Sequence, residues 1–343
     1  MIAGRWSILA MLAAVVWVSD AGAQSWRRVQ GIDSTRGVYA LASHGGAYYA
    51  VSDTLVYRSA DGLNWQVTAA QPPAQYGGYT LFSHTSGLYL GTVLDGVSRT
   101  TDGGQTWHRP AAGLTTGSVL AFTALGDTLF AGTGDQGVLA FNWKSSASWF
   151  PYNTGLSQVG TNALFATPDR LIASVGAYTF ARPRGSSQWT QTDMNESLFQ
   201  PYVFDFIGLG AYVFAGTDDG VFRTPSTASA WQRADIAGMT GKNIQTFALQ
   251  GSRLFAGLNY QGQHWIWSTD NAGGTWDVRA HEFAEIWDLM IVGNRMWAAR
   301  QDGLWYYDLD PVSIRRAPRA GMKAAPIGLR GRMLNGRRLP LLP

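Results

Sequence analysis

The stretch Thr100-Thr-Asp-Gly-Gly-Gln-Thr-Trp107 is the most regular copy of a segment that recurs along the whole chain of 343 residues. Each copy ends in a tryptophan, and successive tryptophans are 39 to 45 residues apart: Trp26, Trp65, Trp107, Trp149, Trp189, Trp231 and Trp276. Short apolar stretches separated by Gly-containing turns fill the intervals between them. A repeat of this length with only strand and turn signals predicts a β-propeller with one blade per repeat.

The two ends of the repeat array complement each other. The repeat array begins with Ser25-Trp26-Arg27-Arg28-Val29, which has the pattern of a fourth strand, whereas the last repeat (residues 287–310) has three strands and no fourth. We therefore expect an all-β fold over residues 24–310, a seven-bladed β-propeller of four-stranded blades. The ring would be closed by the N-terminal strand pairing into the last blade, which covers both sheet edges.

Residues 1–23 have the pattern of a secretory signal peptide. A basic N-terminus precedes the apolar run Ile8–Val18, and small residues up to Ala23 offer a cleavage site before Gln24. This run is shorter than the roughly 20 apolar residues that span a bilayer, so we expect export without stable membrane insertion. The destination would be the periplasm, the cell surface or the medium. The chain has no Cys, which excludes disulfides and a cysteine-linked lipid anchor.

Charge divides the chain into two parts. Residues 311–343 carry eight basic residues and no acidic residue, whereas residues 24–310 carry 17 basic and 22 acidic residues. The predicted propeller is therefore mildly acidic. We expect no nucleic-acid partner, because binding to phosphates requires a basic face.

The basic tail, residues 311–343, has two interpretations. The segment Ile327-Gly-Leu-Arg-Gly-Arg-Met-Leu-Asn-Gly-Arg-Arg-Leu339 resembles the terminal strand of the sorting signals of type IX secretion, although Gly328 stands where those signals have Asp. This resemblance implies export to the cell surface. The alternative is a disordered tail, rich in Pro, Gly and Arg, that contacts acidic surfaces of the cell envelope.

Three hairpins resemble the Asp-box, also called the bacterial neuraminidase repeat, with the pattern S/T-x-D-x-G-x-T-W. Residues 100–107 fit without a mismatch, residues 59–65 are one residue short, and residues 268–276 are one residue long. In the turn, the Asp carboxylate accepts backbone N–H groups and Gly permits the left-handed backbone. The resemblance implies structural roles for the acidic residues and tryptophans of these boxes: Asp61, Asp102, Trp107, Asp270 and Trp276.

Proteins that carry the Asp-box include sialidases, two-propeller glucanases and photosystem assembly factors. A sialidase needs three converging arginines and an Arg-Ile-Pro motif; this chain lacks the motif, and Arg58, Arg99 and Arg223 occupy equivalent positions of three blades, which spread around a ring. The glucanases need a cleft between two rings, and this chain has one. The single-ring assembly factors are similar in size and export signal, but the blades show no matching basic patch.

The loops between second and third strands should gather near the axis at one end of the ring. Most of them carry acidic residues: Asp53, Asp95, Asp135, Asp218, Asp219 and Asp302. An acidic ring could bind a cation or a hydroxyl-rich ligand, or these residues could be the ordinary Asp of tight turns. The longer loop of the sixth blade adds groups suited to sugar stacking and hydroxyl recognition: Asn259, Tyr260, Gln261 and His264. No metal motif of recognised spacing occurs, and we expect neither a metal nor a cofactor.

Two aspartates, Asp205 and Asp288, stand at equivalent positions of innermost strands where the other blades have Ala, Leu or Thr. A carboxyl group among apolar neighbours has a raised pKa or a partner, and a raised pKa suits a general acid. The only glutamates of the chain lie on the connections between blades: Glu196, Glu282 and Glu285. These five residues are the candidates for catalysis. The alternative is that the two aspartates cap backbone groups or waters in the central channel.

The sequence thus predicts a secreted, monomeric, non-catalytic propeller that acts as a binding or scaffold module at the bacterial envelope or outside the cell. Its partner would be a glycan or an envelope protein. One alternative is a glycoside hydrolase-like enzyme that uses carboxylates on the central loop face, which would require carboxylates about 5–10 Å apart. Another is an assembly factor of envelope or photosystem type, which a flat apolar face would favour.

Overall fold

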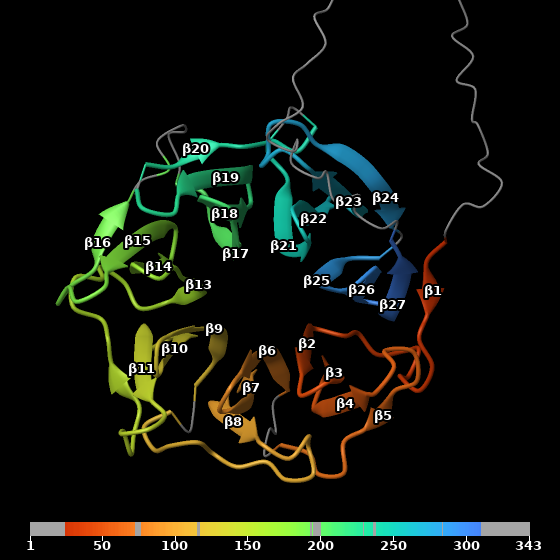
Figure 1. Ribbon diagram of the computed structural model, residues 1–343, viewed down its shortest axis with the longest axis horizontal. Helices are drawn as coiled ribbons and strands as arrows, with labels where there is room; N and C mark the ends of the chain where they lie inside the picture. The colour runs from red at the N-terminus through yellow and green to blue at the C-terminus, as the bar shows by residue number, and fades with distance from the viewer. Residues whose placement is uncertain are drawn as a thin grey trace, which may run out of the picture. The chain divides into compact units, whose positions relative to one another are not determined.

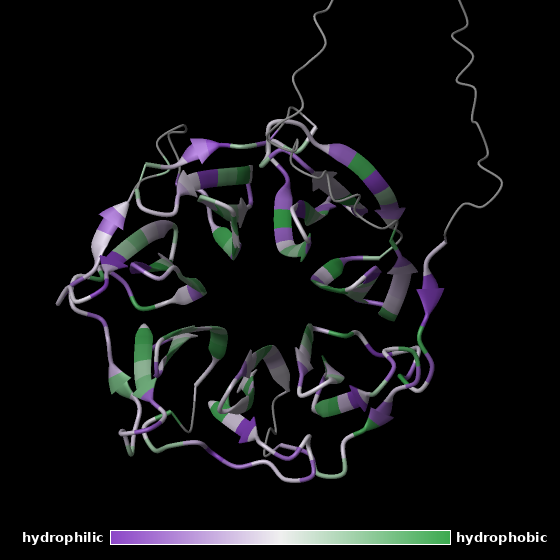
Figure 2. Cartoon of the chain, in the orientation of Figure 1, coloured by the Kyte–Doolittle hydropathy of each residue, from purple (hydrophilic) through white to green (hydrophobic). Residues whose placement is uncertain are grey.

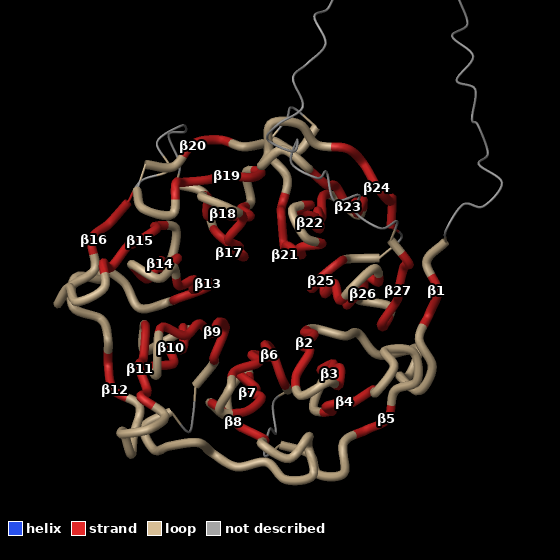
Figure 3. The backbone as a smooth tube through the Cα atoms, viewed as in Figure 1, coloured by secondary structure: helices blue, strands red, loops and turns tan. Residues whose placement is uncertain are grey.

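The computed structural model describes residues 25–72, 77–114, 117–192, 194, 200–228, 230–235, 238–282 and 284–309. These residues form seven antiparallel sheets arranged as blades around a central channel (Figure 1). The regular elements of the described chain are all strands (Figure 3), so this part offers no helix that could cross a membrane. The expected all-β, seven-bladed propeller is confirmed. The expected signal peptide (1–23) and basic tail (311–343) lie outside the described residues.

Within each blade the first strand lines the channel and the following strands lie successively farther out (Figure 1). Blade 1 contains β2 (Ala40–His44), β3 (Ala47–Ser52), β4 (Leu55–Ser59) and β5 (Gln66–Val67). Blade 2 contains β6 (Gly78–His84), β7 (Gly87–Thr92) and β8 (Val97–Thr100), and its fourth strand is reduced to the bridge between Arg99 and His108. Blade 3 contains β9 (Val119–Leu125), β10 (Thr128–Thr133), β11 (Val138–Asn142) and β12 (Phe150–Pro151).

The remaining blades follow the same order. Blade 4 contains β13 (Thr161–Ala166), β14 (Arg170–Val175), β15 (Tyr178–Pro183) and β16 (Thr190–Thr192). Blade 5 contains β17 (Val203–Leu209), β18 (Tyr212–Thr217), β19 (Gly220–Pro225) and β20 (Gln232–Arg233). Blade 6 contains β21 (Asn243–Gln250), β22 (Arg253–Tyr260), β23 (Gln263–Thr269) and β24 (Asp277–Glu282). Blade 7 contains β25 (Ile286–Val292), β26 (Arg295–Arg300), β27 (Gly303–Asp308) and β1 (Arg27–Arg28).

Strand β1 closes the ring, as expected from the sequence. Arg27 pairs with Tyr306 and Arg28 with Trp305, so the first strand of the chain becomes the outer strand of the last blade. An ion pair between Arg27 and Asp308 adds to this contact. The closure removes the exposed edge of β27, which would otherwise be a template for pairing with another chain.

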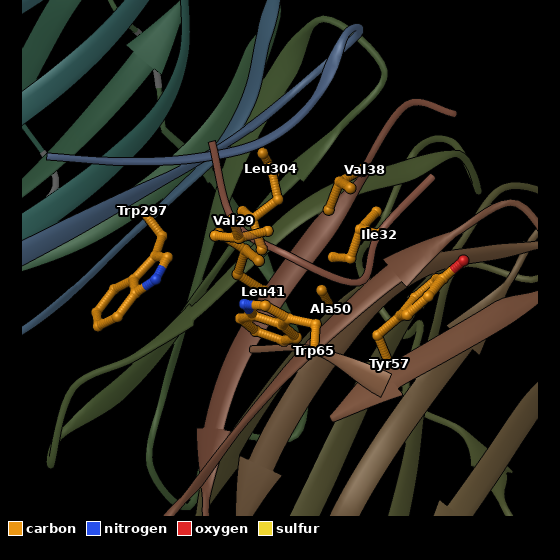
Figure 4. Close-up of a cluster of buried hydrophobic side chains, with 10 residues drawn as sticks. Val29, Ile32, Val38, Leu41, Ala50, Tyr57, Trp65, Trp297 and Leu304 are labelled. Atoms are coloured by element: carbon orange, nitrogen blue, oxygen red, sulfur yellow. The ribbon is translucent and has the colours of Figure 1, made fainter. Parts of the chain in front are cut away.

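The core lies between neighbouring blades, and the repeated tryptophans occupy it. Trp65, from the hairpin of blade 1, packs with Trp297 and Leu304 of blade 7 and with Val29 (Figure 4). The tryptophans of the other hairpins lie in the equivalent clusters, each between its own blade and the preceding one. Apolar residues concentrate on the inner strands, whereas the outer strands β1 and β20 are hydrophilic (Figure 2). Stability therefore comes from sheet-to-sheet packing around the ring.

Candidate functional site

The two ends of the ring differ in the turns that they carry. One end, here named the loop face, holds the blade-to-blade connections and the turns between second and third strands: 53–54, 93–96, 134–137, 176–177, 218–219, 261–262 and 301–302. The opposite end, here named the hairpin face, holds the turns between first and second strands and the hairpins that lead to the tryptophans. The innermost strands enclose a central cavity of about 640 Å³.

On the hairpin face, Asp61 and Asp102 act as turn acceptors. Asp61 Oδ1 accepts the N–H groups of Leu63 and Asn64, both at 2.8 Å. Asp102 Oδ2 accepts the hydroxyl of Thr106 at 2.6 Å, and its Oδ1 accepts the N–H of the same residue at 2.9 Å. The N–H of Asn64 lowers the pKa of Asp61, and the hydroxyl of Thr106 lowers the pKa of Asp102. Both carboxylates are thus committed to their own hairpins.

The hairpin of blade 6 corrects one prediction from the sequence. Asn271, not Asp270, takes the position of Asp102: its Oδ1 accepts the N–H of Thr275 at 2.9 Å and the hydroxyl of Thr269 at 2.8 Å. This hairpin therefore has no extra residue, and an amide oxygen replaces the carboxylate as acceptor. Asp270 instead forms an ion pair with Arg253 at 2.7 Å.

The two tryptophans predicted to be structural are both buried. Trp107 is 8% and Trp276 is 4% exposed, and each belongs to a cluster between two blades. The indole Nε1 of Trp276 donates to the carbonyl oxygen of Ala234 in the preceding connection at 2.7 Å.

On the loop face, three of the predicted acidic residues are paired with arginines. Asp53 contacts Arg36 at 2.8 Å, Asp219 contacts Arg233 at 2.5 Å, and Asp302 contacts Arg300 at 2.9 Å. Such pairing fits the role of turn residues better than that of an assembled acidic ring.

The other acidic residues of the loop face also take part in local structure. Asp218 Oδ1 accepts the N–H of Tyr202 at 2.9 Å, and burial raises the pKa of Asp218. The main chain of Asp95 donates to Thr92 Oγ1 at 2.8 Å, and Asp135 lies beside Gly117. Within the described part of the chain, no three His or acidic side chains are placed to hold a metal ion.

The loop of blade 6 divides into a structural half and an accessible half. Asn259 accepts the N–H of Ile286 at 3.1 Å and donates to its carbonyl oxygen at 2.7 Å, which ties blade 6 to blade 7. His264 Nδ1 lies 2.9 Å from Asn259 Oδ1, and both residues are buried. Tyr260 is 37% exposed and Gln261 is exposed in a left-handed conformation (φ 48°). Of the four predicted residues of this loop, Tyr260 and Gln261 are the exposed ones.

A polar cavity of about 500 Å³ lies beside this loop, between blades 6 and 7. Its lining includes residues from both blades and from the connections that precede them: Asn243, Asn259, Tyr260, Gln261, His264, Glu285 and Gln301. Lys242 Nζ lies 4.9 Å from the ring centre of Trp265 and 5.7 Å from that of Tyr260. The cavity combines an aromatic ring, neutral amides and one carboxylate, which suits a ligand rich in hydroxyl groups.

Further aromatic residues of the loop face were not among the sequence candidates. Tyr39 and Trp287 stack with ring centres 4.6 Å apart and planes at 8°. Tyr79 is 47% and Tyr202 is 36% exposed. Tyr39 and Tyr79 occupy the start of an innermost strand, which is the one signal in the sequence that could have identified them.

Asp205 and Asp288 both line the central cavity, but each also links two blades. Asp205 Oδ2 accepts the N–H of Phe247 in blade 6 at 2.9 Å, and Asp288 Oδ2 accepts the N–H of Leu41 in blade 1 at 2.8 Å. The hydroxyl of Thr246 donates to Asp288 Oδ1 at 3.2 Å. Both residues are partly buried, and the surrounding apolar strands desolvate their carboxyl groups. Burial raises the pKa of Asp205 to about 7 and that of Asp288 to about 6.

Of the three candidate glutamates, only the side chain of Glu285 is described. Glu285 lines the central cavity and the cavity between blades 6 and 7. Glu282 ends strand β24, and only its main chain is described, while Glu196 lies outside the described residues. Among the side chains that the structure describes, Glu285 is thus the glutamate found at a cavity.

Neither a protein family model nor a curated protein matches this sequence, but solved structures do. The chain is similar to the extracellular domain of a one-component system from B. thetaiotaomicron, with 15% identity and a TM-score of 0.68. That match covers 83% of this chain and 40% of the other, so the chain spans less than half the length of that structure. It is also similar to YCF48 from Cyanidioschyzon merolae, with 15% identity, a TM-score of 0.65, and coverage of 83% of this chain and 98% of the other.

A third similar structure is the WD40 β-propeller domain of Doa1, with 10% identity and a TM-score of 0.63. This match covers 83% of the chain and 97% of that domain. At such identities the likeness shows the fold alone, since propellers serve many unrelated functions. The comparisons therefore agree with the geometry on one conclusion: the chain is a seven-bladed β-propeller.

Proposed function

We propose that this chain is an exported, non-catalytic binding module of the Asp-box type that binds a glycan at its loop face. The observation that carries the proposal is the cavity between blades 6 and 7, where the exposed ring of Tyr260 lies beside the amides of Asn243, Gln261 and Gln301. A phenol ring can stack on the apolar face of a sugar while amides bind its hydroxyl groups. The propeller neighbours, which include an extracellular domain, are consistent with a binding or scaffold module.

A glycan and polysaccharide panel tests this function, with binding and released product scored together on residues 24–343. We expect binding without product release, and we expect Tyr260→Ala to weaken it by about tenfold or more, since a stacked aromatic contact is lost. Tyr79→Ala is the matched control, because Tyr79 is an exposed tyrosine of the same face on blade 2. Equal affinity of Tyr260→Ala and the unchanged chain would refute the site.

A second function, glycoside hydrolysis, is favoured by the raised pKa of Asp205 and Asp288 at the wall of the central cavity. A protonated carboxyl near neutral pH is the group that such an enzyme uses as general acid. Against it stand the hydrogen bonds that commit both carboxylates to the main chain of the next blade. Product release that disappears in Asp205→Asn or Asp288→Asn would establish the enzyme and overturn the binding module.

A protein partner is the remaining possibility for the loop face. Exposed apolar side chains occur there on blade 2, where Tyr79 is 47%, Val93 39% and Leu94 49% exposed. If the glycan panel gives no binding at all, an envelope or assembly partner becomes the better hypothesis. Leu94→Asp would then be expected to abolish its capture, while Tyr260→Ala would leave it intact.

Export itself is part of the proposal and can be tested separately. N-terminal sequencing of the protein recovered outside the cytoplasm should begin at Gln24. Removing residues 311–343 should leave the protein in the periplasm if the tail is a sorting signal, and should not change its location if the tail only contacts envelope surfaces.

A further inference from the structure

The hairpins of blades 3 and 4 differ from the Asp-box hairpins at their first position. Five residues stand seven positions before the tryptophan of their blade: Thr100, Asn142, Arg182, Thr224 and Thr269. In the two full-length Asp-box hairpins, the threonine hydroxyl accepts the N–H four residues later, from Gly104 at 2.9 Å and from Gly273 at 3.0 Å. In blade 4 the bond is reversed, because Arg182 Nε donates to the carbonyl oxygen of Ser186 at 3.0 Å. A long cation therefore replaces a small hydroxyl at the hairpin face.

Arg182 is a buried cation held by neutral groups. The residue is only 7% exposed, and its guanidinium carbon lies 3.4 Å from the ring centre of Tyr152. Its Nη1 donates to the carbonyl oxygen of Tyr152 at 3.5 Å. Among the described residues, no carboxylate pairs with Arg182 and Nη2 has no acceptor. Burial accordingly lowers the pKa of Arg182. A buried charge without a counter-charge is costly, so its environment favours an incoming anion.

Nη2 of Arg182 has a place for such an anion. Arg182 lines a cavity of about 320 Å³ between blades 3 and 4, on the hairpin face, at the lower end of the size range of small-molecule sites. Asn142, the equivalent residue of the neighbouring blade, also lines this cavity, and the exposed Arg184 adds a second cation. The one carboxylate of the lining, Asp127, is paired with Lys144 at 2.8 Å. The net charge around the cavity is therefore positive.

We propose that this cavity is an anion site that binds the carboxylate of a small organic acid on the free edge of the Arg182 guanidinium. The ring of Tyr152 packs on the face of the guanidinium and the Ser186 carbonyl oxygen accepts from Nε, so that both contacts hold the group in place before an anion binds. Arg184 draws the anion toward the rim, and the amide of Asn142 offers a further hydrogen bond. The site lies at the opposite end of the ring from the glycan cavity and does not depend on it.

The indole of Trp189 provides a local readout, because its Nε1 donates to the same Tyr152 carbonyl oxygen at 2.6 Å. Residues 24–343 labelled with ¹⁵N would be titrated with sodium D-glucuronate, sodium acetate and D-glucose at constant ionic strength. We expect both acids to shift the Trp189 indole and Arg182 Nε signals, and glucose to leave them unchanged. Tighter binding of glucuronate than of acetate would identify a sugar acid as the ligand class, and equal binding would identify the carboxylate alone.

Two variants separate the site from adventitious binding. Arg182→Lys keeps the charge but loses the planar donor edge and should weaken glucuronate binding by about tenfold or more. Arg36→Gln, on the loop face, is the control that should leave it unchanged. The proposal is overturned if the acids do not shift the Trp189 indole, or if Arg182→Lys folds with the native indole spectrum and binds glucuronate as tightly as the unchanged chain. Loss of glycan binding in Tyr260→Ala would have no bearing on this result.

Discussion

The hairpins of blades 2 and 6 and that of blade 4 hold the same tryptophan by different chemistry. In blades 2 and 6 a side-chain oxygen, from Asp102 or Asn271, accepts the N–H group of the residue before the tryptophan. In blade 4 the hydroxyl oxygen of Ser186 accepts the equivalent N–H, from Gln188, at 3.3 Å, and Arg182 bonds the carbonyl oxygen of Ser186. The indoles of blades 6 and 4 nevertheless make equivalent contacts: Trp276 Nε1 donates to the carbonyl oxygen of Ala234 at 2.7 Å, and Trp189 Nε1 to that of Tyr152 at 2.6 Å.

The tryptophan between two sheets is therefore the constant element of the repeat, and the turn before it can vary in its hydrogen bonds. The turn can therefore exchange its acceptor, from Asp or Asn to Ser, and gain a different group at its first position. In blade 4 the first position of the hairpin holds a buried cation, Arg182, at the hairpin face. The constant tryptophan and the variable turn can be tested separately.

The largest effect should come from removing the tryptophan in either kind of hairpin. Trp276→Ala and Trp189→Ala should each lower the free energy of unfolding by about 3–5 kcal/mol, because both leave a cavity between two blades. Urea denaturation followed by circular dichroism would measure the loss. Val278→Ala is the control, since Val278 is 53% exposed. A much smaller loss for Trp189→Ala than for Trp276→Ala would show that the tryptophan of blade 4 is not equivalent.

The channel and hairpin carboxylates should respond to pH in opposite directions. The pKa of Asp205 is about 7 and that of Asp288 about 6 in the folded chain, above the ordinary value of 3.8. Their stabilising contribution is therefore complete below pH 3.8 and is lost as the pH rises through about 6 to 7. The pKa values of Asp61 and Asp102 are lowered, so their contribution is present above 3.8 and is lost as the pH falls below it.

The double variant Asp205→Asn with Asp288→Asn removes the contribution of the two channel aspartates to the pH dependence of stability. Asparagine keeps an oxygen that accepts the N–H groups of Phe247 and Leu41 but cannot ionise. We expect the melting temperature of the unchanged chain to fall between about pH 4 and 7, and that of the double variant to stay nearly level. Parallel curves for the two proteins would show that neither aspartate titrates in this range.

A smaller effect should distinguish two hairpin glycines with the same backbone conformation. Gly62 in blade 1 and Gly185 in blade 4 have φ of 73° and 82°, which any other residue adopts at a cost of about 1–2 kcal/mol. A Cβ at Gly62 would also lie 2.3 Å from the Trp297 ring, whereas one at Gly185 meets open space. Gly62→Ala should therefore lower the free energy of unfolding by about 1–3 kcal/mol more than Gly185→Ala. Equal losses would mean that the Trp297 ring can move aside.

The sequence was sufficient for the fold because its strongest signal is the one that the core uses. The spacing of the tryptophans marks the interfaces between blades, and the unmatched strand around Arg27 marks the closure with Tyr306. Both features depend on local patterns that repeat. Because the repeats can be aligned on their tryptophans, each blade supports the same assignment of strands.

The sites were less accessible to sequence reasoning because they depend on pairing across blades. Asn271 was missed because its amide oxygen replaces a carboxylate as the acceptor in the turn. The number of residues between this position and Trp276 identifies the acceptor better than the presence of an Asp does. The stack of Tyr39 on Trp287 joins the first and the last blade of the ring. No pattern in the sequence around either residue indicates this contact. Arg182 was not among the sequence candidates, and only its burial reveals a cation without a counter-charge.

The smallest effect, and the sharpest test of exchangeable turns, should come from swapping the two acceptors. Asp102→Asn should keep most of the thermal stability at neutral pH, because Asn271 shows that an amide oxygen can accept the same N–H group. Asp102→Ala removes the acceptor and should cost more, since the N–H and hydroxyl of Thr106 then lose their partner.

The stability at acidic pH should distinguish the two acceptors further. The lowered pKa of Asp102 means that its contribution disappears on acidification, so the unchanged chain should lose more stability below pH 3.8 than Asp102→Asn. Asn271→Asp should show the reverse, with an added acid-sensitive term. If Asp102→Asn were as damaging as Asp102→Ala, the charge of the carboxylate would be what holds the turn, and the hairpin of blade 6 would need a different explanation.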